Sequence, residues 1–225
     1  MQRTFGSSTC LSGLVVLVAV SMPLSGTTIS LNSGSDSTGT TQWNSVGGAG
    51  VPNTVVTPNA AWKAPFDGAQ WISFEGTGAS GLVIADAGTF RTPSFRPSAS
   101  FYQSFTIPSG PSSGGINVWS DDTAAVYIDS TLAFPVQLAA ADVHCVHGAI
   151  SCGPGEGGYV SLAGLAAGTH VVRFDVWQLG GDSFGLLYSG QVTSADDPPS
   201  VPEPATYALL AGGLIGLASY RRLRR

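Results

Sequence analysis

Residues 99–107, Ala-Ser-Phe-Tyr-Gln-Ser-Phe-Thr-Ile, alternate between apolar and polar side chains. In an extended chain these side chains point to two faces, with Phe101, Phe105 and Ile107 on one and Tyr102, Ser104 and Thr106 on the other. A period of two residues is typical of a β-strand that buries one face and exposes the other. The stretch therefore predicts a strand with one side packed on a hydrophobic core.

Other segments show the same period, and turn-forming residues separate them. We expect strands at Ile116–Trp119, Ala124–Ile128, His170–Trp177 and Phe184–Val192, with shorter ones at Gly26–Ser33, Gln42–Val46 and Ala69–Phe74. The expected core face includes Ile116, Val118, Val126, Ile128, Val172, Phe174 and Val176. Outside the two ends of the chain, only Pro135–Val143 favours a helical turn or two. This spacing of strands and turns predicts an all-β fold, a jelly-roll-like β-sandwich over residues 22–192.

The amino terminus has the pattern of a secretory signal peptide. One positive residue precedes an apolar stretch at residues 11–20, and Ala19-Val20-Ser21 offers the small residues of a cleavage site. We expect cleavage after Ser21, which makes residues 1–21 the signal peptide. A cut near Gly26 is the alternative.

The carboxyl terminus combines three features in a fixed order. A Pro-Glu-Pro box, an apolar segment without charge at residues 205–220 and a cluster of arginines follow one another. The residues are Val201, Pro202, Glu203 and Pro204 in the box, and Arg221, Arg222, Arg224 and Arg225 in the cluster. This order resembles the PEP-CTERM sorting tail of exported bacterial proteins. The resemblance implies processing by a membrane-embedded exosortase, and a surface or extracellular location in a bacterium that makes extracellular polysaccharide.

The tail also has the physical properties of a short transmembrane helix. As a helix, residues 205–220 would span roughly 24 Å at ~1.5 Å per residue, against a hydrocarbon core of about 30 Å. The arginines of residues 221–225 can reach the headgroups, and they favour a cytoplasmic carboxyl terminus. Residues 193–204 hold four prolines, which predicts a stiff linker. We therefore expect export across the inner membrane, with anchoring by this helix until the tail is processed.

The charge of the exported part argues against one class of partner. From Met22 to Ser200 the chain has 4 basic and 13 acidic residues, a net charge of 4 − 13 = −9. Binding to nucleic acid needs clustered Lys and Arg, so we expect no nucleic acid partner. An excess of Asp suits a surface that meets sugars or divalent cations, although solubility alone explains it equally well.

The cysteines predict a disulfide bond. Because Cys10 leaves with the signal peptide, Cys145 and Cys152 remain as a pair in an oxidising compartment. A bridge between them would contribute roughly 2.5 kcal/mol through the entropy of the unfolded chain. The alternative is a metal site with the neighbouring His144 and His147, but their spacing matches no standard zinc pattern.

One segment looks like a catalytic motif. Gly181–Gly185, Gly-Asp-Ser-Phe-Gly, resembles the serine-protease box Gly-Asp-Ser-Gly-Gly but departs from it at Phe184. Asp142-Val143-His144-Cys145 faintly resembles the histidine–cysteine pair of that family, but only 38 residues separate His144 from Ser183, too few for the family's two-barrel arrangement. Since Gly, Asp and Ser are turn formers first, we expect no enzymatic activity.

An acidic pair suggests a possible ligand. Asp121 and Asp122 precede the strand expected at Ala124–Ile128, in a stretch that is similar to galactose-binding-like and PA14-like jelly rolls. The resemblance implies that paired aspartates hold calcium, which in turn grips sugar hydroxyls, and oxygen ligands suit calcium. The candidate sugar-stacking residues are Trp119, Tyr127 and Trp177. In the alternative, the two carboxylates cap a turn and the aromatic side chains are buried.

These features together predict an exported PEP-CTERM-type protein of the cell surface or extracellular matrix, without catalytic activity and sorted by an exosortase. The alternative is a calcium-dependent carbohydrate-binding module that acts on exopolysaccharide. Calcium is the one cofactor that this alternative requires.

Overall fold

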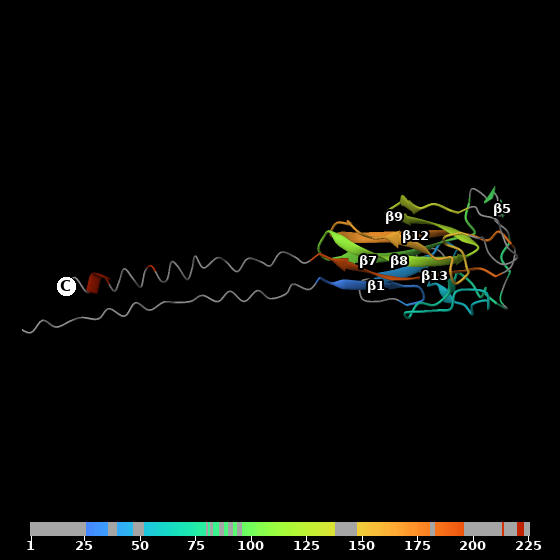
Figure 1. Ribbon diagram of the computed structural model, residues 1–225, viewed down its shortest axis with the longest axis horizontal. Coiled ribbons are helices and arrows are strands. Elements are labelled where there is room, and N and C mark those ends of the chain that lie inside the picture. Colours follow the sequence, from blue (N-terminus) through green and yellow to red (C-terminus); the bar gives the residue numbers. More distant parts are fainter. Residues whose placement is uncertain are drawn as a thin grey trace, which may run out of the picture.

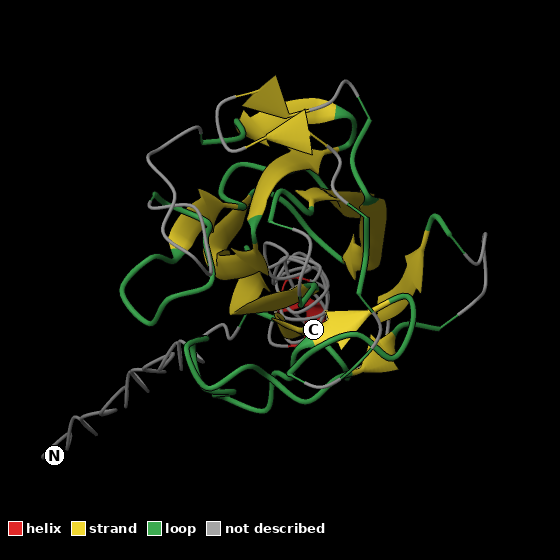
Figure 2. Ribbon diagram, turned by 90° about the vertical axis from the view of Figure 1, so that its right-hand side faces the viewer, coloured by secondary structure: helices red, strands yellow, loops and turns green. Residues whose placement is uncertain are grey.

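The computed structural model describes residues 26–35, 40–46, 52–79, 81, 83–85, 88–89, 92–93, 96–137, 148–180, 183–195, 213 and 220–222. Within these residues the chain forms two antiparallel β-sheets that pack face to face (Figure 1). Figure 2 looks along the sandwich and shows it as strands joined by loops. The predicted all-β, jelly-roll-like β-sandwich is confirmed.

Sheet A has six strands. In order they are β11 (Gly158–Ser161), β8 (Ser112–Asp121), β13 (Gly185–Ser194), β4 (Ile72–Ser73) and β3 (Thr54–Val55), and β1 (Thr28–Asn32) also pairs with β13. The central pair, β8 and β13, runs antiparallel over the full length of both strands. Because β1 pairs with β13, the first and last strands of the domain lie side by side (Figure 1).

Sheet B has five strands. In order they are β10 (Thr131–Phe134), β9 (Thr123–Ile128), β12 (Gly168–Trp177), β7 (Ala99–Ile107) and β2 (Thr40–Asn44). A separate hairpin of β5 (Gly88–Thr89) and β6 (Thr92–Pro93) lies at the end of the sandwich away from the start of β1 (Figure 1).

The main core lies between the two sheets and consists of the residues that the alternation predicts. β7 buries alternate residues along its whole length, including Phe101, Phe105 and Ile107. The predicted inward residues of β8, β9 and β12 join them: Ile116, Val118, Val126, Val172, Phe174 and Val176 are buried, and Ile128 packs against the cluster. Each large apolar side chain buried in this way contributes about 1.5–3 kcal/mol, which explains why the pattern fixes the inner face.

A second apolar cluster covers one half of the outer face of sheet A. Trp119 of β8 and Leu187 of β13 lie opposite each other and point away from the main core. The segment before β4 places Trp62 and Trp71 in the same cluster, with their ring centroids 4.3 Å apart. The Trp71 indole N–H also donates to the Lys63 carbonyl at 2.7 Å. The segment before β4 therefore packs on the outer face of sheet A through this second apolar cluster. The rest of that outer face carries polar residues.

The strands differ from the prediction in a few places. β10 and β11 have no counterpart among the predicted strands, because four residues are too few for a clear period. Of the strand expected at Ala69–Phe74, only Ile72–Ser73 pairs as β4, since Ala69 and Trp71 enter the second cluster. β13 continues to Ser194, two residues into the predicted linker.

Several predicted elements lie outside the described residues. They include the signal peptide at residues 1–21, the Pro-Glu-Pro box, most of the helix expected at residues 205–220, and Cys145 with His144 and His147. Residues 213 and 220–222 are helical. Among the described residues there is no helix with the length and apolar character needed to cross a membrane.

Candidate functional site

Four neighbouring strands of sheet A place one residue each in a single row on the outer face. The row consists of Tyr159 on β11, Asn117 on β8, Ser189 on β13 and Asn32 on β1. Directly opposed residues of antiparallel strands point to the same face, so the register brings these side chains together. With strands about 4.8 Å apart, the row extends over about 14 Å.

A second row lies two residues further along the same strands. It consists of Gly115 on β8, Gln191 on β13 and Ser30 on β1. Gly115 is required here, because a Cβ at this position would lie 2.5 Å from the Tyr159 hydroxyl and 2.5 Å from the Val160 carbonyl oxygen. The tyrosine therefore extends over bare backbone, and 58% of its surface is exposed.

The two rows form the floor of a hollow of about 490 Å³, which we call the sheet A groove. Tyr159 lines it on one side, and Asp67, from the covering segment, lines it as well. This volume falls within the range of about 300–1,000 Å³ that is typical of small-molecule sites.

Hydrogen bonds fix the β1 side of the groove. The buried Ser189 hydroxyl donates to Asn32 Oδ1 at 2.9 Å, and Asn32 Nδ2 donates to the Asp67 carbonyl at 2.8 Å. The asparagine thus connects the floor to the covering segment. The groove is consequently held in shape by the protein's own side chains.

Most of the side chains that line the groove are polar and uncharged. Asn117 and Gln191 are exposed and offer amide donors and acceptors, and Tyr159 offers an aromatic ring and a hydroxyl. Asp67 carries the one charge among the described residues that line the groove. An aromatic ring beside amides and hydroxyls suits a ligand with both apolar faces and many hydroxyl groups.

Sequence reasoning did not identify the groove. The residues of its floor come from four strands that are not consecutive in the chain, and only the register aligns them. One signal was present: the outward positions of β8 and β13 carry Gly, Asn, Ser and Gln where a simple solvent face often carries charges. That signal marks a polar face, but it does not show which residues meet.

Asp121 and Asp122 lie at the corner where the chain passes from sheet A to sheet B. Asp121 still pairs with Gly185 in sheet A, while the next residue after the corner, Thr123, pairs with Trp177 in sheet B. The peptide bond between the two aspartates is cis. Both aspartates are almost completely buried, at 3% and 1% exposure.

The Asp122 carboxylate caps the connection between β12 and β13 by accepting backbone hydrogen bonds. Its Oδ2 accepts hydrogen bonds from the backbone N–H of Leu179 at 2.5 Å and of Gly180 at 3.1 Å. This geometry matches the turn-capping alternative. No group of three or more His, Cys, Asp or Glu side chains suited to a metal ion occurs in the part of the chain that the structure describes. Calcium binding at Asp121 and Asp122 stays a prediction.

The three candidate sugar-stacking residues lie in different places. Trp119 belongs to the second cluster and Trp177 to a small cluster on the outer face of sheet B, and they are 8% and 7% exposed. Such burial leaves neither indole a face for a sugar ring. Tyr127 is partly exposed, but the Arg173 guanidinium carbon lies 3.9 Å from its ring centroid. The register brings none of the three into the sheet A groove.

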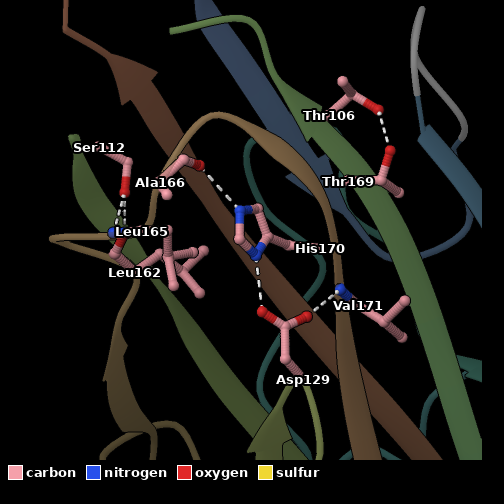
Figure 3. Close-up of polar contacts among 9 residues, drawn as sticks. All are labelled: Thr106, Ser112, Asp129, Leu162, Leu165, Ala166, Thr169, His170 and Val171. Carbon is pink, nitrogen blue, oxygen red and sulfur yellow. Dashed lines mark hydrogen bonds and ion pairs between the residues drawn. The ribbon is translucent and has the colours of Figure 1, made fainter. Parts of the chain in front are cut away.

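An aspartate and a histidine meet at the other sheet, as Figure 3 shows. Asp129 lies in the turn after β9, and His170 Nδ1 is 2.6 Å from its Oδ2. His170 Nε2 faces the Ala166 carbonyl at 2.9 Å, and Asp129 Oδ1 accepts the Val171 N–H. An Asp–His pair forms part of a hydrolase triad, but there Nε2 faces a nucleophile. Here it faces a carbonyl oxygen, so the arrangement joins loops.

Partial burial of His170 disfavours its charged form, but other contacts outweigh this effect. The Asp129 hydrogen bond, the Ala166 carbonyl and the negative charge of Asp129 together raise the pKa of His170 above its ordinary value. Both ring nitrogens face acceptors, and only the protonated imidazole donates from both.

Ser183 and Cys152, two further candidates from the sequence, are both buried. Ser183 is 4% exposed and its hydroxyl donates to the Gly78 carbonyl at 3.2 Å, which suits a turn former. Cys152 is completely buried in the second cluster, while its predicted partner Cys145 lies outside the described residues. The predicted disulfide therefore stays a prediction.

The carboxyl terminus matches a known sorting signal. Residues 200–225 match the family described as the PEP-CTERM protein-sorting motif. The resemblance predicted for the tail is confirmed, and the motif implies an exported protein that an exosortase processes. No curated protein matches the chain in sequence.

Several solved structures are similar to the chain at low identity. A family 35 carbohydrate-binding module from Clostridium thermocellum has 13% identity and a TM-score of 0.34, over 75% of this chain and 99% of that one. The GH26-CBM35 beta-(1,4)-mannanase of Podospora anserina has 15% identity and a TM-score of 0.32, over 78% of this chain and 29% of that one. The catalytic domain of a GH87 alpha-1,3-glucanase has 13% identity and a TM-score of 0.31, over 82% of this chain and 31% of that one.

Proposed function

We propose that this chain, which ends in a PEP-CTERM sorting motif, is a surface or matrix protein whose β-sandwich binds extracellular polysaccharide without cutting it. The observation that carries the proposal is the sheet A groove, where the exposed ring of Tyr159 adjoins a floor of amides and hydroxyls. The sorting motif supports the location at which such a ligand is found.

The groove has the features that sugar binding requires. A pyranose ring has an apolar face that packs on an aromatic side chain, and hydroxyl groups at its edge that exchange hydrogen bonds with amides. Tyr159 supplies the first kind of contact, and Asn117 and Gln191 supply the second. Because Ser189 and Asn32 are already hydrogen-bonded to each other, the floor needs little reorganisation on binding.

A single carboxylate among the described residues of the groove favours binding over cleavage. Hydrolysis of a glycosidic bond generally uses two carboxyl groups on either side of the bond. Among the described residues that line the groove, Asp67 is the one that carries a carboxylate. This composition supports a module that holds polysaccharide, as the predicted non-catalytic function requires.

Affinity electrophoresis of the full chain in gels that contain neutral polysaccharides tests the proposal. Tyr159→Ala removes the stacking ring and should weaken binding roughly fivefold to tenfold, the loss expected for about 1–1.4 kcal/mol of aromatic contact. Asn117→Ala should weaken binding as well. Tyr127→Ala is the matched control, because that tyrosine lies on sheet B and should leave retardation unchanged.

The Tyr159→Ala and Tyr127→Ala variants distinguish binding in the sheet A groove from binding at the sugar-stacking residue expected from the sequence on sheet B. If Tyr127→Ala abolishes binding and Tyr159→Ala does not, the ligand binds on sheet B and the groove is excluded. If the parent protein is retarded by none of the polysaccharides, with or without calcium, the carbohydrate-binding function is excluded altogether.

A further inference from the structure

We infer that Asp67 makes the sheet A groove selective for polysaccharides that carry positively charged amino groups, an inference that rests on the proposed function. Asp67 lines the groove and is exposed to solvent. A carboxylate at the rim adds an electrostatic contribution that neutral amides and hydroxyls do not supply.

The backbone holds Asp67 in one position at the rim. Asp67 and Gly68 have φ angles of 49° and 82°, which place both in the left-handed region of a tight turn. The turn is closed by a hydrogen bond of 2.8 Å from the Ala69 N–H to the Phe66 carbonyl. Asn32 Nδ2 holds the Asp67 carbonyl at 2.8 Å, so the turn is joined to the groove floor. The backbone position of Asp67 at the groove is thus set before any ligand arrives.

Phe66, the residue directly before Asp67, anchors the turn to sheet A. The Phe66 ring packs edge-on against Trp119, with the ring centroids 5.1 Å apart. Since Trp119 belongs to β8, which also carries Asn117, the turn and the groove floor are built on the same strand. Movement of Asp67 away from the groove would disturb this cluster.

No described residue neutralises the charge of Asp67. Lys63 is the single lysine of the chain, and its Nζ lies 5.1 Å from the Phe66 centroid and 5.7 Å from the Trp119 centroid. Among the described ion pairs none joins Lys63 to Asp67, and no basic residue lines the groove among those described. With a net charge of −9 over residues 22–200, the exported part as a whole also attracts cations and repels acidic sugars.

The size of the preference follows from the solvent exposure of the ion pair between the Asp67 carboxylate and a ligand amino group. Ion pairs in contact with solvent are worth up to about 1 kcal/mol, which corresponds to about a fivefold difference in Kd. Salt screens such a pair, and at 1 M ionic strength the Debye length is only about 3 Å. The preference should therefore disappear in concentrated salt, whereas contacts of Tyr159 should persist.

Two oligosaccharides with the same backbone provide the probe. A β-1,4-linked glucosamine hexamer carries amino groups, and the N-acetylglucosamine hexamer is its neutral counterpart. Titration calorimetry of the full chain with each, in mildly acidic buffer where amines are protonated and carboxylates stay ionised, gives the ratio of the two Kd values. We expect the amine form to bind about fivefold more tightly, and the ratio to fall to about one in Asp67→Asn. Glu75→Gln, which removes an exposed carboxylate that is not part of the groove, should keep the ratio.

The outcomes separate this inference from the proposed function. If both hexamers bind the parent equally, or if Asp67→Asn keeps the preference, the role of Asp67 is excluded while the groove still binds sugar. Tighter binding of an oligogalacturonate than of the amine form would also overturn it. If neither the hexamers nor the neutral polysaccharides bind, and Tyr159→Ala changes nothing, the proposed function fails first.

Discussion

Gln42 on β2 and Gln103 on β7 lie directly opposite each other in sheet B, and both are buried, yet within the described part of the chain only Gln42 has side-chain hydrogen-bond partners. The Gln42 amide donates to the carbonyls of Asn32 and Ser35 at 2.6 and 2.8 Å and accepts the Gly34 N–H at 3.1 Å. Neither polar atom of the Gln103 side chain has a partner among the described residues.

This difference predicts opposite effects of the same substitution. Gln103→Met replaces an unpaired buried amide by an apolar side chain of similar length and should stabilise the fold by about 1 kcal/mol or more. Gln42→Met leaves three backbone groups without their partner and should cost about 1–3 kcal/mol. Urea unfolding of the two variants measures both values. A similar loss of stability in both variants would show that Gln103 is paired in solution.

The contact between His170 and Asp129 predicts a pH-dependent contribution to stability. Because the folded pKa of His170 is raised above 6.5, protonation favours the folded state. The contribution is complete below pH 6.5 and is lost as the pH rises through the folded pKa. Since Asp129 is largely exposed, we expect a loss of less than about 1 kcal/mol.

Thermal melts from pH 5 to pH 9 measure this contribution relative to His170→Gln, which takes up no proton. The difference in melting temperature between the parent and this variant should shrink as the pH rises. Asp129→Asn keeps a hydrogen-bond acceptor but removes the charge, and should reduce the pH dependence. A difference that grows with pH would mean that the neutral imidazole is the stabilising form.

The sorting motif predicts a defect in processing. Replacement of Pro202, Glu203 and Pro204 by alanine should leave export intact but keep the full-length protein in the membrane, because the exosortase no longer recognises the tail. Cell fractionation and the mass of the protein in each fraction measure this. Unchanged processing of the triple variant would show that another part of the tail is recognised.

The cysteine pair predicts a bridge in the exported protein. Mass spectrometry of the secreted form without reduction should find Cys145 joined to Cys152, and reduction should cost roughly 2.5 kcal/mol. Loss of Cys152 should have an additional effect, because this side chain is completely buried in the second cluster. Two free thiols together with stoichiometric zinc would favour the metal site with His144 and His147 instead.

The two hypotheses for Asp121 and Asp122 predict different responses to calcium. If Asp122 only caps the connection between β12 and β13, Asp122→Ala should cost about 1–3 kcal/mol because the N–H groups of Leu179 and Gly180 lose their acceptor. This cost should be the same with calcium and with chelator. A calcium site with a hundredfold excess of ion would instead add about 2.7 kcal/mol to the parent. Melting curves in both buffers distinguish these results.

The alternation of side chains made the strands of the sandwich predictable. β7 has the bounds that its nine-residue pattern predicts, and the inward residues of β8, β9 and β12 were assigned correctly. The reason is local, since a strand between a core and solvent repeats every two residues. The sorting motif was predictable for a related reason, because its box, apolar segment and arginines are contiguous.

The outward aromatic residues show where local patterns stop being informative. Trp119 and Trp177 do point away from the main core, as their positions in the strands indicate. Whether an outward side chain meets solvent depends on the segments that pass over the sheet. The segment with Trp62 and Trp71 covers Trp119, so an expected sugar-stacking residue is part of a second core.

The sequence by itself therefore determined the fold class, the inner faces of the strands and the sorting signal. Tertiary structure alone decided the site, because Tyr159, Asn117, Ser189 and Asn32 come from four strands that only the sheet register aligns. A shift of one residue in that register would turn each of these side chains to the opposite face. Register is fixed by packing of the entire core, a property that no short stretch of sequence contains.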